Sequence, residues 1–174
     1  TSLMWRYLPR LQRRGQGSAE SADMDLIVYK HPQSQISEAI SHIYSSLMLS
    51  VSGRPPCAIM VTSPNPSEGK TMLVANLGQF FALNDRQVVL IDCDLRKPRL
   101  HQIFQVESQP GLSNYLTGSA TLEEILRPTA IPNLTIITAG ARPPSPGNLL
   151  NSEPFKELLK ELRQHFRHII IDTP

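Results

Sequence analysis

The sequence has 174 residues, 40% of them hydrophobic, which is enough for one compact domain with a core and too few for two ordinary domains. Its net charge of +2 arises in residues 1–14, which hold four arginines and no acid, so the remainder is slightly acidic and lacks the broad basic surface that nucleic-acid binding needs. Two cysteines without zinc-ligand spacing, and no apolar run approaching roughly 18–20 residues, argue against a disulfide scaffold, a metal cluster and a membrane span.

Residues 1–14 mix apolar and aromatic side chains with arginine, a composition that suits the cytoplasmic edge of a membrane and equally a disordered arm. The stretch Gly15–Asp25 is rich in Gly, Ser, Gln and Ala and has no apolar period, so it is typical of a flexible linker. We therefore predict a basic juxtamembrane-like segment and linker over residues 1–23, followed by a domain over residues 24–174.

From Met24 onward, helical and strand patterns alternate. Helices are predicted at Ser37–Ser50, Thr71–Leu83, Leu100–Phe104, Thr121–Leu126 and Glu153–Phe166, and strands at Ala58–Thr62, Gln87–Asp92, Leu134–Thr138 and His168–Asp172. The strands are continuous apolar runs, as expected of parallel strands buried on both faces. The sequence thus predicts an α/β fold with a mainly parallel sheet between two helical layers, truncated at the C-terminus because it stops directly after a strand.

Two further signals lie in the second half of the chain. Thr121 and Glu124 have the T-x-x-E spacing of a helix capping box. The proline-rich stretch Arg142–Leu150 is predicted as a stiff turn that leads into the last helix. That helix carries one apolar stripe, made of Phe155, Leu158, Leu159, Leu162 and Phe166.

The segment Ser63–Thr71 lies between a predicted strand and a predicted helix and reads S-P-N-P-S-E-G-K-T. This is the setting of a phosphate-binding P-loop, in which backbone N–H groups wrap the β-phosphate, Lys70 bridges β- and γ-phosphates and the Thr71 hydroxyl ligates Mg²⁺. The pattern G-x-x-x-x-G-K-[ST] fails at Pro64, where its first glycine is expected. Gly-Lys-Thr alone is usually an ordinary helix start, but the flanking strand and helix favour the P-loop.

Carboxylates follow two of the other apolar strands. Asp92 and Asp94 come at the end of one, and Asp172 ends the strand His168–Asp172. Ligands of open α/β sheets bind at this edge, where such carboxylates can hold hydrated Mg²⁺ or accept a proton. Taken alone, an i, i+2 pair of this kind is more often a helix cap or a turn.

These motifs together resemble the bacterial tyrosine kinases of capsule and exopolysaccharide assembly. The resemblance rests on the P-loop, on L-I-D-C-D-L-R-K-P with its D-x-D-x-R-x-P signature, on P-P-S-P-G-N-L-L and on I-I-I-D-T-P. It implies a Rossmann-like, three-layer P-loop NTPase that uses ATP and Mg²⁺, with Asp92 favoured for activating the acceptor hydroxyl. It further implies catalytic roles for Lys70, Asp92 and Asp94, cofactor binding by Pro66, Ser67, Glu68, Gly69, Lys70, Thr71 and Met72, and metal binding by Thr71, Asp94 and Asp172.

By the same resemblance, the protein would be a tyrosine autokinase that regulates polysaccharide polymerisation and export at the cytoplasmic face of the bacterial inner membrane. A tyrosine-rich tail would be its substrate. It would self-associate or join a transmembrane polysaccharide co-polymerase subunit, reaching the membrane through a fused or partner segment. Ser41 and Tyr44 replace the two arginines of the family's E-x-x-R-x-x-R motif after Glu38, which weakens the expectation of a ring, and Ser67 replaces a usual glycine.

Two other functions stay open at this point. One is a non-kinase P-loop ATPase switch of the partition and septum-positioning class, whose P-loops usually carry a second, early lysine that Ser63–Glu68 lacks. The other is a degenerate nucleotide-binding regulatory module, which the altered positions Ser41, Tyr44 and Ser67 favour. The intact set of Lys70, Thr71 and three strand-end acids counts against that module.

Overall fold

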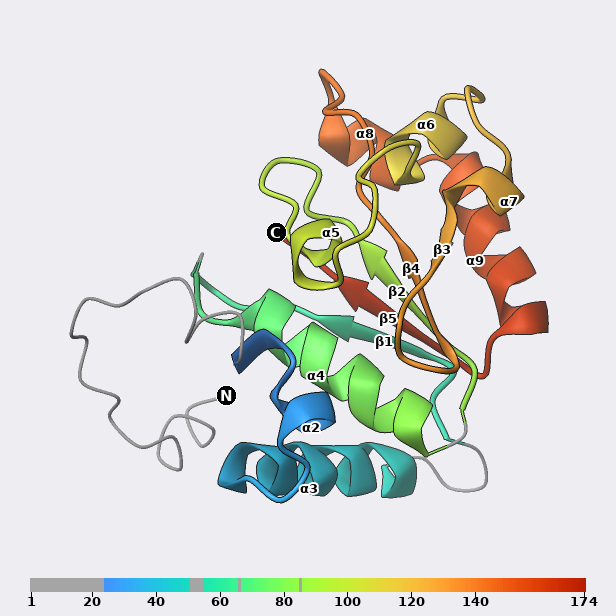
Figure 1. Ribbon diagram of the computed structural model, residues 1–174. Coiled ribbons are helices and arrows are strands. Elements are labelled where there is room, and N and C mark those ends of the chain that lie inside the picture. The colour runs from blue at the N-terminus through green and yellow to red at the C-terminus, as the bar shows by residue number, and fades with distance from the viewer. Residues whose placement is uncertain (1–23, 51–54, 66, 85) are drawn as a thin grey trace.

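The computed structural model describes residues 24–50, 55–65, 67–84 and 86–174. The predicted segment and linker of residues 1–23, and Pro66 of the predicted P-loop, lie outside them. A five-stranded sheet crosses the middle of the molecule in the order β1-β5-β2-β4-β3 (Figure 1). Four strands are parallel, namely β1 (Ala58–Val61), β5 (His168–Asp172), β2 (Val88–Asp92) and β4 (Leu134–Ile137), and β3 (Leu126–Pro128) pairs antiparallel with β4.

Helices cover the sheet on both sides, so the predicted three-layer α/β architecture is confirmed (Figure 1). One side carries α2 (Ile27–Lys30), α3 (Gln35–Leu49), α4 (Lys70–Leu83) and α5 (Leu100–Ile103). The other side carries α6 (Leu112–Leu116), α7 (Leu122–Ile125), α8 (Pro146–Leu150) and α9 (Glu153–His165). No helix within the described ranges is long and apolar enough to cross a bilayer.

The continuous apolar strands have the physical cause that their sequence indicated. Every residue of β2 and β5 is buried, and successive side chains point into opposite layers. Leu90 and Ile170 join the core beneath α4, whereas Val89, Ile91 and Ile169 join the core beneath α9. Burial on both faces therefore fixes both strands in the centre of the sheet.

Helix α4 lies unusually close to the sheet because of Gly78. A Cβ atom at Gly78 would lie 2.5 Å from Leu90 Cδ2 and 3.2 Å from Leu90 Cγ. Only a residue without a side chain fits this contact. The glycine thus allows the close approach of α4 to β2. The predicted P-loop precedes α4, and Asp92 ends β2.

Tyr44 packs between α3 and α4. Its ring centroid lies 5.1 Å from that of Phe80 and 4.8 Å from that of Phe81, which is edge-on to it. A position where the kinases that the sequence resembles usually carry an arginine is therefore part of a helix–helix contact in this chain. At the second arginine position of the E-x-x-R-x-x-R motif, an aromatic contact replaces the guanidinium.

Most predicted elements are present with shifts of one or two residues at their ends. The capping box is confirmed, since Glu124 N donates to Thr121 Oγ1 at 3.4 Å and Thr121 N donates to Glu124 Oε2 at 2.8 Å. The stripe on α9 is also confirmed, with Leu158 and Leu162 fully buried.

The prediction of a stiff proline turn over Arg142–Leu150 is wrong in its second half. Residues Pro146–Leu150 form the short helix α8. Pro146 is its first residue, where a missing N–H costs nothing and the fixed φ angle suits a helical turn. The short elements α2, α6 and β3 were not predicted.

Candidate functional site

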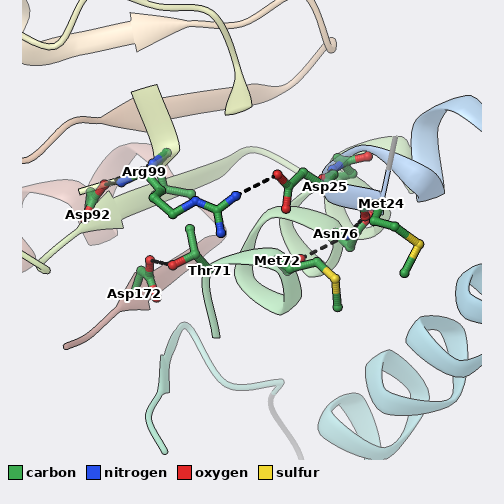
Figure 2. Close-up of polar contacts among 10 residues, drawn as sticks. Met24, Asp25, Thr71, Met72, Asn76, Asp92, Arg99 and Asp172 are labelled. Atoms are coloured by element: carbon green, nitrogen blue, oxygen red, sulfur yellow. Dashed lines mark hydrogen bonds and ion pairs between the residues drawn. The ribbon is translucent and has the colours of Figure 1, made fainter. Parts of the chain in front are cut away.

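The register of the sheet brings the carboxyl ends of three strands together. Asp172 at the end of β5 pairs with Val61 of β1 on one side and with Asp92 of β2 on the other. The loops that follow these strands therefore meet at one edge of the sheet, where α4 also begins. The predicted P-loop and the predicted strand-end acids share this edge (Figure 2).

Two residues of the loop before α4 have left-handed backbone conformations. Gly69 is the N-cap of α4 with φ 86°, and Ser67 has φ 62°. Both angles lie in the left-handed region, which glycine adopts freely and which costs serine roughly 1–2 kcal/mol. Helix α4 begins at Lys70, one residue earlier than predicted. The N–H groups of a first helical turn have no partner within the helix and are able to bind an anion.

Hydrogen bonds between residues of this loop stabilise it. Glu68 accepts hydrogen bonds from Asn65 Nδ2 at 3.0 Å and from Asn65 N at 3.3 Å. Lys70 Nζ donates to Ser63 Oγ at 3.0 Å, so the ammonium group contacts the start of the loop. A phosphate group is a stronger acceptor than this hydroxyl and would compete for the lysine.

Thr71 and Asp172 form the contact at the centre of the edge. Thr71 Oγ1 donates to Asp172 Oδ2 at 2.7 Å, although the two residues are 101 positions apart in sequence. Asp172 is 1% exposed, and its second oxygen, Oδ1, is buried without a hydrogen-bond partner among the described residues. Burial raises the pKa of Asp172, and the Thr71 hydrogen bond opposes that rise.

This pair fits a magnesium ion that takes most of its ligands from water and phosphate. Mg²⁺ binds oxygen atoms and is usually held by one or two protein groups. Asp172 Oδ1 and the Thr71 hydroxyl supply such oxygens, and the orphaned Oδ1 lacks the partner that a buried carboxylate needs. The described part of the chain contains no cluster of three or more His, Cys, Asp or Glu side chains that would hold a metal alone.

Asp92 is fully buried and accepts three backbone hydrogen bonds. The donors are Asp94 N at 3.2 Å, Arg99 N at 3.1 Å and Leu100 N at 3.1 Å, so the carboxylate caps the start of α5. Burial, joined by the charge of Asp172, raises the pKa of Asp92 to about 7 in spite of these donors. A carboxyl group that titrates near neutral pH is typical of functional sites.

Asp94 is half-buried and folds its own loop. Its Oδ1 accepts from Arg96 N at 3.1 Å and from Lys97 N at 2.9 Å, which is a side-chain-stabilised turn. Asp94 is also close enough to Asp172 for its charge to raise the pKa of that residue. The cap and the turn that a D-x-D pair usually forms are thus present here, at the same edge as the loop before α4.

Of the predicted site residues, the structure brings Lys70, Thr71, Asp92, Asp94 and Asp172 to this edge. Ser67, Glu68 and Gly69 form the loop beneath it, and Met72 lies in the first turn of α4, where its carbonyl accepts from Asn76 Nδ2 at 2.9 Å. Pro66 lies outside the described residues. The role of each residue in binding or catalysis remains a prediction.

Sequence reasoning missed one ion pair at this site. Arg99 Nη2 lies 3.0 Å from Asp25 Oδ2, and Figure 2 shows the guanidinium between Asp25 and the Thr71–Asp172 contact. Arg99 directly follows the D-x-D-x-R-x-P motif, which was a usable signal. Asp25 had none, because its partner is 74 positions away.

The chain matches the family model described as CobQ/CobB/MinD/ParA nucleotide binding domain over residues 59–171. It is 34% identical over 152 residues to the tyrosine-protein kinase ptk of Acinetobacter johnsonii, covering 87% of this chain and 21% of that protein. It is also 34% identical over 162 residues to the tyrosine-protein kinase YwqD of Bacillus subtilis, covering 93% of this chain and 68% of that protein. The chain thus spans only about a fifth of the Acinetobacter protein.

Solved structures give the same picture. The kinase domain of the Escherichia coli tyrosine kinase ETK matches with a TM-score of 0.81 and 30% identity, covering 100% of this chain and 66% of that domain. The septum site-determining protein MinD of Pyrococcus horikoshii, complexed with Mg-ADP, matches less well, with a TM-score of 0.59 and 28% identity over 67% of this chain and 48% of that one.

Proposed function

This chain belongs to the bacterial tyrosine-kinase domains of the CobQ/CobB/MinD/ParA nucleotide-binding family, and from that premise we propose that it is an ATP-dependent protein-tyrosine autokinase. The observation that carries the proposal is the contact between Thr71 and the buried, half-satisfied Asp172 at the start of α4. This contact joins a P-loop helix to a strand-end acid, which is the arrangement that Mg²⁺-assisted phosphoryl transfer requires.

The phosphate side of the reaction falls to the loop and to α4. Lys70 would leave Ser63 for the β- and γ-phosphates, and the free N–H groups of the first turn of α4 would bind the phosphate oxygens. Thr71, Asp172 and the half-buried Asp94 would hold the metal. MgATP supplies the phosphoryl group and the charge that offsets its negative oxygens. The Mg-ADP bound by the related MinD protein supports this choice of cofactor.

Asp92 would accept the proton of the attacking tyrosine hydroxyl. A carboxylate with a pKa of about 7 has the proton affinity that a general base needs at neutral pH. All three of its donors are backbone N–H groups of the loop and helix start that follow β2. The base role therefore requires these residues to move when the acceptor binds, so that one carboxylate oxygen becomes free.

The cellular role follows from family membership alone. The acceptor would be a tyrosine-rich tail of the same protein or of a neighbouring copy. The kinase would self-associate or join a transmembrane co-polymerase subunit, and it would control exopolysaccharide or capsule polymerisation at the cytoplasmic face of the inner membrane. The aromatic packing of Tyr44 leaves no guanidinium at that motif position to bridge subunits, so any ring would rest on other contacts.

A non-kinase ATPase switch is the second candidate. The structural likeness to MinD favours it, with a TM-score of 0.59 over 67% of this chain. The absence of any lysine in Ser63–Glu68 argues against it, because switches of that class usually place a second lysine there.

Both functions are tested by incubating the purified full-length protein with ATP and Mg²⁺ and measuring phosphotyrosine and released phosphate in parallel. Phosphotyrosine that is lost in Asp92→Asn but formed by the exposed-surface control Glu123→Gln supports the kinase and the base. Phosphate release without phosphotyrosine, with a tyrosine tail and partner present, would move the assignment to the switch. If neither phosphotyrosine nor released phosphate forms, the degenerate nucleotide-binding module is the function that remains.

A further inference from the structure

The ion pair between Arg99 and Asp25 links the edge of the sheet to the segment that enters the domain. Asp25 is 6% exposed, and its burial raises its pKa more than Arg99 lowers it. Burial disfavours the charged form of a carboxylate, and a buried carboxylate that loses its partner destabilises the fold strongly. Arg99 therefore has one fixed anchor, on the far side from the Thr71–Asp172 contact (Figure 2).

Two buried amides fix Asp25 itself. Asn76 Nδ2 donates to Met24 O at 2.8 Å, and Gln79 Nε2 donates to Asp25 O at 2.9 Å. Both amides lie on α4 and are fully buried, and Asn76 also accepts from Val28 N at 3.2 Å. The backbone on either side of the Asp25 carboxylate is thus tied to the helix that begins at the P-loop.

The backbone of Arg99 is also fixed by a hydrogen bond. Its backbone N–H donates to Asp92 Oδ2 at 3.1 Å, in the cap of α5. The side chain crosses from that cap toward α4, and its charge is near enough to Asp172 to lower the pKa of that carboxyl. A guanidinium has five N–H donors in a planar fork, and within the described residues the bond to Asp25 is the side-chain hydrogen bond that Arg99 makes.

The remaining donors of Arg99 are accessible. Its side chain is 48% exposed, whereas that of Asp25 is 9% exposed. Figure 2 shows the guanidinium over the side of the site where Thr71 and Asp172 meet. A triphosphate seated on α4, with its metal at Thr71 and Asp172, would bring its terminal phosphate under this cation. Arginine matches phosphate oxygens in bidentate geometry and stabilises charge that develops during phosphoryl transfer.

We propose that Arg99 contacts the γ-phosphate of the bound nucleoside triphosphate, and that Asp25 is the positioning residue that holds the guanidinium in place. The proposal rests on the proposed function, because it needs a nucleotide on the P-loop. It adds a residue that distinguishes triphosphate from diphosphate. It also makes the segment beginning at Met24 part of the nucleotide site, so displacement of that segment would weaken binding of ATP and not of ADP.

The test compares the affinities for fluorescent ATP and ADP analogues, in the presence of Mg²⁺, on the purified full-length protein and its variants. Arg99→Ala leaves the backbone N–H bond to Asp92 intact, and it should lower the ATP-to-ADP affinity ratio about tenfold, equal to about 1.4 kcal/mol. Arg99→Lys should recover part of the loss, since it keeps the charge without the planar fork. Asp25→Asn should lower the ratio by about threefold, because the guanidinium keeps a hydrogen-bond acceptor and loses the negative charge that holds it in place.

Lys97→Ala is the matched control, since it removes an exposed positive charge from the same loop. An unchanged ratio in this variant assigns the effect to contact by Arg99 and not to the general field of the loop. Equal losses in Lys97→Ala and Arg99→Ala would overturn the proposal. An unchanged ratio in Arg99→Ala, with ATP still bound by the wild type, would overturn it and leave the proposed function standing. A wild-type protein that binds neither nucleotide would overturn both.

Discussion

The burial of Asp92 makes a quantitative prediction about stability and pH. The pKa of this carboxyl rises from 3.8 to about 7 on folding, chiefly because of desolvation. Between these two values the unfolded chain loses a proton that the folded chain keeps, so the free energy of unfolding falls as pH rises. At about 1.4 kcal/mol for each pH unit, the cost to the folded state reaches about 4 kcal/mol above pH 7 and vanishes below pH 3.8.

Asp92→Asn removes the titration and keeps an oxygen that can accept from Arg99 N and Leu100 N. The unfolding free energy of the variant, minus that of the wild type, should therefore rise by about 4 kcal/mol between about pH 4 and about pH 8. The charge of Asp172 interacts with Asp92, so the effect of that interaction is part of the difference. Taking the difference cancels the contribution of Asp25, whose raised pKa acts in the same direction. It also cancels that of His168, whose lowered pKa acts in the opposite direction below pH 6.5.

The assay is urea denaturation followed by far-ultraviolet circular dichroism at several pH values across that window. Glu123→Gln, which makes the same chemical change at an exposed position on α7, is the control and should run parallel to the wild type. Parallel curves for Asp92→Asn and the wild type would refute the reasoning, because they would mean that Asp92 is ionised in the folded protein throughout the window.

Three other variants test separate parts of the site. Lys70→Met should lower ATP affinity at least about a hundredfold by removing a charge-assisted contact to two phosphates, and unchanged affinity in a calorimetric titration would remove Lys70 from the site. Ser67→Gly should raise the free energy of unfolding by up to roughly 1 kcal/mol, since it relieves left-handed strain at φ 62° that is present without a nucleotide; a lower free energy of unfolding in urea would contradict this. Gly78→Ala should lower the free energy of unfolding by about 1–2 kcal/mol through its clash with Leu90, whereas Gly147→Ala, which meets nothing within 4 Å, should not lower it.

The parts of the fold that the sequence predicted are those in which the polarity of each residue reflects whether its position is buried or exposed. The runs V-V-L-I and H-I-I-I are apolar at every position because β2 and β5 are buried on both faces. The acids that end these strands could be assigned to one edge because parallel strands end on the same side of a sheet. Asp92 and Asp172 were predicted at the site for this reason, and Thr71 was predicted there because it ends the P-loop pattern.

Other features depend on pairing that no local pattern records. Helices α2 and α6, which were not predicted, have four and five residues. Segments this short are too brief to show a helical period in the sequence. Strand β3 contains Pro128 and pairs only at the edge, where an absent N–H is tolerated. The Asp25–Arg99 pair joins residues 74 positions apart. Asp25 was placed in the predicted linker Gly15–Asp25, whereas the structure buries it.

Whether the carboxyl edge of the sheet is a magnesium–nucleotide site is tested most directly by calorimetric titration of ATP, with and without Mg²⁺, into the wild type and Asp172→Asn. We predict that Mg²⁺ strengthens ATP binding to the wild type by at least about tenfold and that Asp172→Asn loses this gain, because the substitution removes the carboxylate that would hold the metal together with the Thr71 hydroxyl. Wild-type binding that is independent of Mg²⁺, or a gain that survives in Asp172→Asn, would contradict the account.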